Sequence, residues 1–382
     1  MKITNIELFK VPPRWLFVKI TTDNGLEGWG EPVVEGKADT VAAAVKEMSW
    51  YLLGKEPRRI EDLWYTLYKG GFYRGGPVLM SAIAGIDQAL WDIKGKSMNA
   101  PVYELLGGAV RDKIKVYSWV GGDKPANVVE AATARVQQGY QAIKMNACPA
   151  MEIIATPRQI DEVVQCIREV RAAVGDGIGI GIDFHGRVHR SMAKILMTEL
   201  DALRPMFYEE PVLSEYPEAF AQLSAWTPTP IATGERLFSR WDFKPFITGG
   251  GVNIIQPDLS HAGGITEVKK IAAMAECYDI ALAPHCPLGP ISLAAALNID
   301  FNCINAVIRE SSIGIHYNQG ADLLDYLLNP EILDVREGHV QRWEAPGLGV
   351  VVDEQKVREM AKVGHDWKNP VWRNADGSVT EW

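Results

Sequence analysis

Three short apolar runs decide the fold, and they read IGIGID (178–183), MFYE (206–209) and IATGE (231–235). Each run ends in an acid, and the intervals between these acids are equal, with 209 − 183 = 26 and 235 − 209 = 26. An interval of this size accommodates one strand, one helix and two short loops, which is the repeat of a parallel βα unit. The pattern predicts strands whose C-terminal ends meet at one face of the fold.

The same alternation of apolar strand and amphipathic helix continues on both sides of these runs. We expect eight strands, at Ile114–Trp119, Ala142–Asn146, Ile178–His185, Met206–Glu210, Ile231–Glu235, Asn253–Asp258, Ile280–His285 and Cys303–Glu310. Eight such units close into a parallel barrel, in which functional side chains gather at the C-terminal ends of the strands. The predicted fold class is therefore α/β, with a modified (β/α) TIM-type barrel.

The segment before the barrel has a different pattern. Strand-like runs at Ile3–Phe9 and Leu16–Thr21 are followed by helical patterns at Asp39–Leu53 and Val78–Lys96. The glycine-rich stretch 70–77 is expected to form a mobile loop. These elements predict an α+β capping domain that the N-terminal part and the C-terminal tail form together.

The predicted domain boundaries follow from this change of pattern. We assign residues 1–112 to the capping domain and residues 113–328 to the barrel. Residues 329–382 form a tail that is expected to pack back on the cap through Trp367, Trp372 and Trp382.

Composition excludes several classes of partner. The 382-residue chain is 47% hydrophobic and has a formal net charge of 39 − 48 = −9, which argues against nucleic acid or an anionic membrane surface. No stretch approaches the roughly 20 apolar residues of a membrane span, and residues 1–15 read as a strand rather than a signal peptide. The five cysteines are odd in number and form no C-x-x-C motif, so we expect a reduced, cytoplasmic protein.

The three equally spaced acids predict a metal site. At a barrel mouth Asp183, Glu209 and Glu235 would repel one another unless a cation lay between them, and ligation by oxygen alone favours a hard divalent ion. We expect one Mg²⁺ per subunit on these three carboxylates. Glu210 directly follows Glu209 and offers the other face of the strand, but the 26-residue interval selects Glu209.

Two histidines follow the same logic. Side chains alternate along a strand, so Asp183 and His185 should share a face, unless His185 is a hydrogen-bonded loop residue beside Gly186. Asp258 and His285 are 285 − 258 = 27 residues apart, again one repeat. A carboxylate that accepts from one ring nitrogen raises the basicity of the other, so this pair predicts a general base. The alternative is a helix-capping aspartate and a histidine held between prolines.

One more acid ends a predicted strand. Glu310 lies 310 − 285 = 25 residues after His285, and it either hydrogen-bonds an anionic intermediate or pairs with a nearby arginine. Three other single histidines, His189, His261 and His316, lie near glycine or loop positions. We expect them to be structural or solvated.

Together these groups predict proton abstraction next to a carboxylate. A metal ion that holds a substrate carboxylate makes the neighbouring C–H acidic enough for a positioned base, and it stabilises the ene-diolate that results. His285, backed by Asp258, is the candidate base. His185 lies beside the metal acids and is placed to protonate a leaving hydroxyl on the β-carbon, which turns deprotonation into dehydration.

Five motifs match one known family. They read FYRGGP (72–77), DFHGR (183–187), GER (234–236), QPDLSHAGG (256–264) and APHCPLGP (283–290). In these motifs the chain resembles the enolase superfamily, in its mandelate-racemase branch, and the resemblance extends from Met1 to Trp382. It implies the same metal acids, base and acid as above, with Asp258 raising the basicity of the base, and it adds Glu310 as stabiliser of the intermediate.

The resemblance also implies partners. The substrate would be a small-molecule sugar acid, with D-galactonate as the first expectation and gluconate or a related diastereomer as the alternative. The cap loops at 14–31 and 70–77 would close over it. The protein would be a homo-oligomer, an octamer in many members of the family.

One position departs from the racemase pattern. Racemases end the second strand in Lys-x-Lys, whose second lysine is a base on the other substrate face, whereas this chain reads Lys144-Met145-Asn146. Dehydration does not need that base, so the change favours a dehydratase over a racemase or cycloisomerase. Lys144 and Asn146 are candidate substrate-binding residues, although Lys144 in a structural ion pair is equally compatible. A barrel retained as a non-catalytic binding protein is the remaining alternative.

Overall fold

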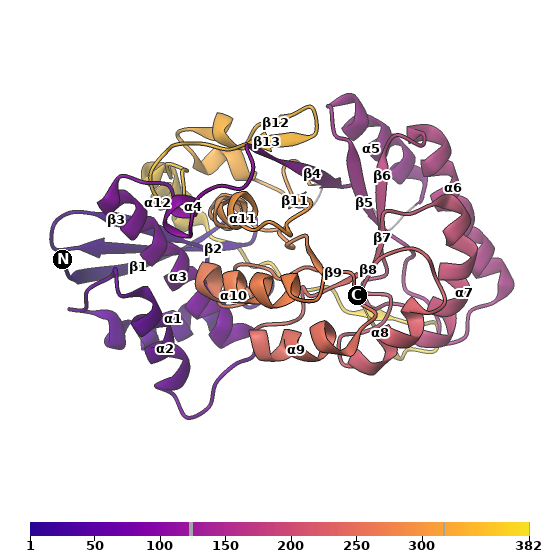
Figure 1. Ribbon diagram of the computed structural model, residues 1–382, viewed down its shortest axis with the longest axis horizontal. Coiled ribbons are helices and arrows are strands. Elements are labelled where there is room, and N and C mark those ends of the chain that lie inside the picture. The colour runs from indigo at the N-terminus through magenta and orange to yellow at the C-terminus, as the bar shows by residue number, and fades with distance from the viewer. Residues whose placement is uncertain (122–124, 316–317, 382) are drawn as a thin grey trace.

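The computed structural model describes residues 1–121, 125–315 and 318–381. Figure 1 shows two parts, with the indigo N-terminal strands on one side and the barrel on the other. The predicted α/β fold class is confirmed, because a ring of parallel strands with surrounding helices is joined to an α+β cap. Within the described ranges, no helix is long and apolar enough to cross a membrane.

The cap is built on a three-stranded antiparallel sheet. β1 (Ile3–Val11) pairs with β2 (Trp15–Thr22), and β2 pairs with β3 (Glu27–Gly30). The cap helices are α1 (Ala38–Leu52), α2 (Ile60–Lys69), α3 (Pro77–Met98) and α4 (Val102–Leu105). β3 and α3 approach so closely that a Cβ at Gly30 would collide with the carbonyl oxygen of Gly85, so glycine is required there.

Eight parallel strands form the barrel, as the sequence predicts. They are β4 (Lys113–Trp119), β5 (Ala142–Asn146), β6 (Gly179–Asp183), β7 (Phe207–Glu209), β8 (Ile231–Thr233), β9 (Ile254–Ile255), β10 (Ala281–Leu282) and β11 (Arg309–Ser311). Neighbours pair in chain order from β4 to β10, β11 pairs with β4, and a bridge between Leu282 and Ala306 closes the ring. β11 begins later than expected, because a turn from Cys303 to Ala306 precedes it.

Helices connect these strands and cover the outside of the ring. They are α5 (Pro125–Gln137), α6 (Pro157–Val174), α7 (Arg190–Leu200), α8 (Pro217–Ser224), α9 (Arg240–Gly249), α10 (Gly264–Glu276) and α11 (Pro290–Asn302). α6 starts at a capping box, in which Thr156 and Gln159 satisfy each other's backbone N–H groups. α11 is buried along its whole length, and Figure 1 shows it with α10 between the cap and the barrel strands.

Side chains fill the barrel below its mouth. This inner cluster consists of Tyr117, Ala142, Phe207, Ala232, Ile254, Ala283 and Ile308. The ring of Phe207 occupies the space beside Gly181, where a Cβ would lie 2.6 Å from the ring. Because side chains alternate, the residues two positions further along these strands point to the mouth, and they include Lys144, Asp183 and Glu209.

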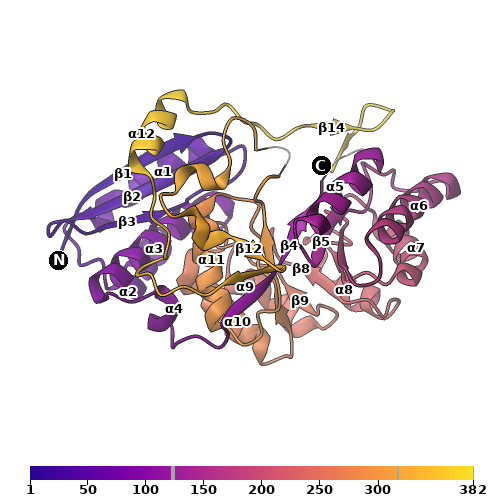
Figure 2. The same ribbon diagram turned by 90° about the horizontal axis from the view of Figure 1, so that it is seen from above.

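The C-terminal tail runs from the cap to the barrel mouth. β12 (Val335–Arg336) and β13 (His339–Gln341) extend the sheet beside β4, and α12 (Glu354–Val363) lies on β1. Figure 2 shows the yellow chain continuing from α12 across the molecule to β14 (Trp372–Arg373), which pairs with β15 (Val379–Thr380).

Two tail tryptophans contact different parts of the molecule. Trp367 packs near the guanidinium of Arg14 in the cap. Trp372, which was expected on the cap, instead lies over the guanidinium of Arg187 in the barrel, with its ring centroid 4.6 Å away. Trp382 is outside the described residues. The tail therefore bridges the cap and the barrel.

Candidate active site

A cavity of about 600 Å³ opens at the C-terminal ends of the barrel strands. Residues that the sequence singled out line its inner part, namely Lys144, Asn146, Asp183, His185, Glu235, His285 and Glu310. These residues, with Glu209 and Asp258 beneath them, are called the strand-end set below. The other side, called the outer wall, consists of Arg14 and Glu35 from the cap and of residues 367–370 and Glu381 from the tail.

The three acids that the sequence predicts as metal ligands lie at neighbouring strand ends. β6 and β7 pair with Asp183 opposite Glu209, so these two carboxylates stand side by side. Glu235 follows β8, and its carboxylate lies within 4.8 Å of ligand atoms of Asp183 and His185. Burial, with added repulsion from Asp183, Glu310 and Glu235, raises the pKa of Glu209 to about 8 against the opposing effect of Lys144.

This donor set fits a divalent metal ion. Its members are carboxylates, which hard cations prefer, and a cation among them would offset their mutual repulsion. The three acids are not equivalent, because the two oxygens of Glu209 also accept hydrogen bonds from Lys144 at 2.6 Å and from Gln256 at 2.5 Å. Asp183 and Glu235 are thus the acids that converge most closely.

The structure separates the two adjacent glutamates. Glu210 has a φ of 40°, in the left-handed region, and its side chain turns away from Glu209. Its Oε2 lies 3.0 Å from Nε of Arg236, which also approaches Glu235 at 3.8 Å. Arg236 therefore supports two acids from behind, and only Glu209 faces Asp183.

Lys144 joins three of the acids. Its Nζ lies 2.6 Å from Glu209, 3.0 Å from Glu310 and 3.8 Å from Asp183. Burial by itself lowers the pKa of Lys144, but Glu209 and Glu310 raise it well above its ordinary value, so the ammonium stays charged. Glu310 thus pairs with a lysine, and its other oxygen accepts the backbone N–H of Cys286 at 3.0 Å.

Asn146 lies at the end of β5, opposite Asp183 in the strand register. It borders the cavity. Its side-chain oxygen is buried, and among the described residues it has no hydrogen-bond partner. An amide therefore occupies this position beside the metal acids.

His185 lies in a turn after β6 and not on the strand, so the alternation of side chains along a strand does not explain its position at the cavity. β6 ends at Asp183, and His185 has a φ of 52° in the turn that follows. Its backbone N–H donates to Asp183 at 2.8 Å, and its backbone carbonyl accepts from Arg236 at 2.8 Å. These bonds hold the turn, and Nε2 lies 3.4 Å from Oε1 of Glu235.

His285 approaches the same carboxylate from the other side. Its Nδ1 lies 2.8 Å from Asp258, and its Nε2 lies 3.4 Å from Oε2 of Glu235. Burial lowers the pKa of His285, but Glu235, Glu310 and Asp258 together raise it to about 10. The two histidines thus face one another across Glu235, which places two acid–base groups at one point.

The outer wall is held by contacts that the sequence pattern did not reveal. Arg14 pairs with Glu35 at 2.9 Å and donates to the carbonyl of Pro287 at 2.6 Å. On the tail side, Arg236 lies 3.7 Å from Glu381. Arg14, Glu35 and Glu381 belong to segments without a repeat, so spacing carries no signal for them.

A buried cap residue anchors the loop that follows His285. The carboxylate of Glu31 accepts the N–H of Gly289 at 2.6 Å and of Ser292 at 3.0 Å, at the start of α11. Burial raises the pKa of Glu31 to about 8, although these two donors oppose the effect. The cap and the loop after His285 therefore share a contact.

Two polar residues near the strand ends were not recognised from the sequence. His261, expected to be structural or solvated, borders the cavity with 8% of its surface exposed. Gln256 donates to Glu209, and its position two residues before Asp258 could have indicated a shared face. His189 is exposed and bonds to Ser191 in α7, whereas His316 is outside the described residues.

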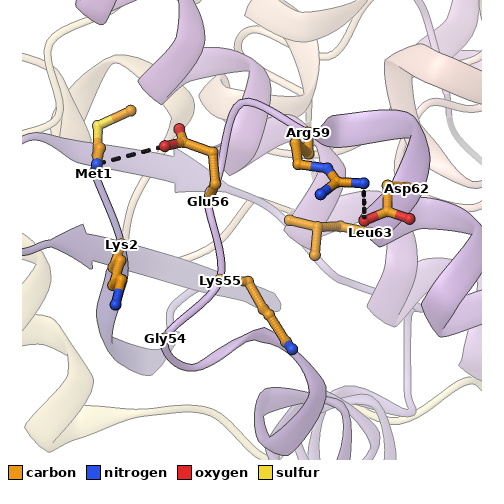
Figure 3. Close-up of a pocket in the computed structure, with 8 residues that line it drawn as sticks. All are labelled: Met1, Lys2, Gly54, Lys55, Glu56, Arg59, Asp62 and Leu63. Carbon is orange, nitrogen blue, oxygen red and sulfur yellow. Dashed lines mark ion pairs between the residues drawn. The ribbon is translucent and has the colours of Figure 1, made fainter.

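A second cavity, of about 330 Å³, lies in the cap. Figure 3 shows its charged residues, in which the amino group of Met1 pairs with Glu56 and Arg59 pairs with Asp62. No histidine lines it, and its acids already have cationic partners. The barrel mouth is therefore the candidate active site.

Both the N-terminal and the C-terminal part of the chain match models of known protein families. Residues 12–107 match the family model of the mandelate racemase / muconate lactonizing enzyme N-terminal domain, and residues 127–356 match the enolase C-terminal domain-like model. The chain is 59% identical to the D-galactonate dehydratases of Ralstonia pickettii (strain 12J) and of Pectobacterium atrosepticum, over 382 residues and 100% of each protein.

Solved structures show the same fold. An enolase from Agrobacterium radiobacter with bound Na and L-malate has a TM-score of 0.91 at 29% identity, and each chain is covered to 100%. A member of the enolase superfamily from Salmonella Typhimurium has a TM-score of 0.86 at 31% identity, covering 94% of this chain and 98% of that one.

Proposed function

Because the chain belongs to the mandelate racemase / muconate lactonizing enzyme family of the enolase superfamily, we propose that it is a hydro-lyase acting on D-galactonate. The products are 2-dehydro-3-deoxy-D-galactonate and water. One observation carries the reaction type, namely that His185 and His285 both place Nε2 3.4 Å from the same Glu235 carboxylate. A base and an acid on adjacent carbons of one substrate need such an arrangement.

The proposed proton transfers use the two histidines in turn. His285, in its neutral form and oriented by Asp258 at 2.8 Å, takes the C2 proton of D-galactonate. A cation held by Glu235 would favour that form, because it would offset the negative charge that raises the pKa of His285. His185 then gives a proton to the C3 hydroxyl, the C3–O bond breaks, and water leaves. The enol that remains takes up a proton at C3 and becomes the 2-keto acid. General acid–base catalysis by each histidine should raise the rate of dehydration by about 10²–10⁴-fold.

We propose that Asp183, Glu209 and Glu235 hold one Mg²⁺ per subunit. When bound, the ion polarises the substrate carboxylate so that the C2 proton becomes more acidic. The proposal is supported by the all-carboxylate donor set, in which Asp183 and Glu235 converge within 4.8 Å.

The remaining members of the strand-end set position the substrate in this proposal. Lys144, held charged among carboxylates, neutralises the substrate carboxylate. Asn146 offers a buried side-chain oxygen without a hydrogen-bond partner among the described residues. Glu310, which pairs with Lys144 at 3.0 Å, is the proposed stabiliser of the intermediate. An amide in place of a second lysine base supports dehydration over racemisation.

Location and assembly complete the proposal. The five cysteines are free thiols, in keeping with the reducing cytoplasm that we propose as the location. The family resemblance supports a homo-oligomer, and light scattering coupled to size-exclusion chromatography measures its mass. An octamer is the expected outcome.

The deciding experiment measures 2-keto-3-deoxy acid formation from D-galactonate, D-gluconate and related diastereomers, with Mg²⁺ and with a chelator. We expect Mg²⁺-dependent product from D-galactonate, well above the other acids. Product from another sugar acid alone would keep the mechanism and reassign the substrate. Lack of product from every acid, despite bound Mg²⁺, would contradict the proposal.

A further inference from the structure

His261 faces the cavity from the loop that carries the aspartate behind the base. Its backbone N–H donates to the carbonyl of Asp258 at 3.1 Å, and its Nδ1 lies 3.9 Å from the Asp258 carboxylate. The ring centroids of His261 and His285 are 6.2 Å apart. His261 thus lies beside the base, on the side where the cap residue Glu35 approaches.

His261 and Glu35 approach each other without completing a hydrogen bond. Nε2 of His261 lies 3.4 Å from Oε2 of Glu35, and among the described residues this buried nitrogen has no hydrogen-bond partner. Burial lowers the pKa of His261, but Asp258 and Glu35 raise it above its ordinary value, which favours a ring that donates. A contact of 3.4 Å leaves this buried donor weakly satisfied, so a cavity ligand that supplies a closer acceptor is favoured.

The chemistry of the pair selects a hydroxyl group as that ligand. A hydroxyl accepts one hydrogen bond and donates another, so one oxygen can accept from Nε2 of His261 and donate to Glu35. A carboxylate would be repelled by Glu35, and an ammonium would be repelled by a protonated His261. Arg14, 2.9 Å from the other oxygen of Glu35, keeps that carboxylate in place.

We propose that His261 and Glu35 bind the C4 hydroxyl of the sugar acid and are specificity-determining residues. The inference rests on the proposed function, in which C2 lies at His285 and C3 at His185. C4 is the first carbon beyond the reacting pair, and His261 lies beside the base, with its ring centroid 6.2 Å from that of His285. D-galactonate and D-gluconate differ only in the configuration at C4. Hydrogen bonds from His261 and Glu35 to the C4 hydroxyl would therefore distinguish the two acids.

The test compares His261→Ala and wild type on D-galactonate and on its 4-deoxy analogue. Loss of a hydrogen bond to a charged group should lower kcat/KM for D-galactonate by about 10- to 100-fold. On the 4-deoxy acid, which offers no hydroxyl to this pair, the variant and wild type should agree within about twofold. The preference for D-galactonate over D-gluconate should fall by the same factor as kcat/KM for D-galactonate.

A purely structural role predicts something different. If His261 only supports Asp258 and the base, His261→Ala should lower kcat/KM equally for D-galactonate and for its 4-deoxy analogue. The preference for the C4 configuration should then stay unchanged. That outcome overturns the proposal. His261→Gln, which keeps a donor near the position of Nε2, should recover part of the loss on D-galactonate alone; failure to recover any would also count against it.

Matched controls separate this inference from the proposed function. His189→Ala removes an exposed histidine and should match wild type on all acids. Removal of the C4 hydroxyl from D-galactonate and from D-gluconate gives the same 4-deoxy acid. The comparison of wild type with His261→Ala can therefore be made with whichever of the two hexonates wild type accepts. Inactivity of wild type on D-galactonate would overturn the proposed substrate, whereas an unchanged C4 preference in an active variant overturns only the role of His261.

Discussion

The strand-end set and the outer wall enclose the same cavity but are built differently. The strand-end set lies on paired strands, where the register fixes Asp183 beside Glu209 and Asn146 beside Asp183. The outer wall comes from a cap segment and from the tail, joined by side-chain contacts such as Arg14 with Glu35 and Arg236 with Glu381. Backbone pairing thus positions the reacting groups, and side-chain contacts position the rest.

This difference suggests a division of labour. Reacting groups tolerate little displacement, so they belong on a rigid ring of strands. Groups that recognise the remainder of a substrate can lie on loops, which accept change more readily. We therefore expect changes in the strand-end set to lower the rate of the chemical step, and changes in the outer wall to alter substrate affinity.

The largest effect should follow Glu235→Gln. Glu235 faces both histidines and lies within 4.8 Å of a ligand atom of Asp183, so the change should lower dehydration by at least about 10³-fold. Calorimetry should show weakened Mg²⁺ binding in the same variant. Glu61→Gln, an exposed acid paired with Lys270, serves as the control. An active variant with normal Mg²⁺ binding would remove Glu235 from the metal acids.

The two histidines should separate by isotope exchange. His285→Asn should lose both dehydration and exchange of the C2 proton with deuterated solvent, by about 10²–10⁴-fold. His185→Asn should lose dehydration to a similar extent but keep the exchange, because C2 deprotonation precedes loss of the hydroxyl. NMR of recovered D-galactonate measures the exchange, with His189→Asn as control. Equal loss of exchange in both variants would contradict these roles.

A change in the outer wall should be milder. Trp367→Ala removes a ring that borders the cavity near Arg14, so substrate should bind less tightly while the strand-end set stays intact. We expect KM for D-galactonate to rise about tenfold, which corresponds to about 1.4 kcal/mol, with kcat within about threefold. Steady-state kinetics measure both values. A fall in kcat with unchanged KM would break the proposed division of labour.

The smallest effect concerns stability. Burial raises the pKa of Glu31 from 4.5 to about 8, so its neutral form is favoured in the folded state. The contribution of neutral Glu31 to the free energy of unfolding is fully present below about pH 4.5 and is lost as the pH rises through about 8. Glu31→Gln should therefore match wild type in acid and unfold a few degrees higher in mild base. Thermal unfolding across this range tests it, and parallel curves would refute the assignment.

The sequence predicted the strand-end set because a repeat leaves a regular signal. Equal intervals located Asp183, Glu209 and Glu235, and all eight strands appear near their expected places. The interval could not show how His185 arrives, because β6 ends two residues earlier and a left-handed turn carries the ring. A backbone conformation of this kind depends on the bonds to Asp183 and Arg236, which only folding brings together.

The outer wall could not be predicted for a related reason. Glu35 and His261 are 261 − 35 = 226 residues apart, and no repeat connects a cap loop with a barrel loop. The path of the tail was equally hidden, since the contact of Trp372 with Arg187 depends on how the chain leaves α12. Long-range contacts between irregular segments give no periodic pattern, so the sequence alone left His261 unrecognised.

The contact between Glu31 and the start of α11 bears on how such proteins diverge. A Cβ at position 289 would lie 2.7 Å from Oε1 of Glu31, so a side chain there would displace this carboxylate from its hydrogen bonds to Gly289 and Ser292. A cap grafted from a distant relative would meet this loop with the wrong partner. Recombination between lineages should therefore succeed mainly where both positions are inherited together, which ties the cap to the catalytic loop as one evolutionary unit.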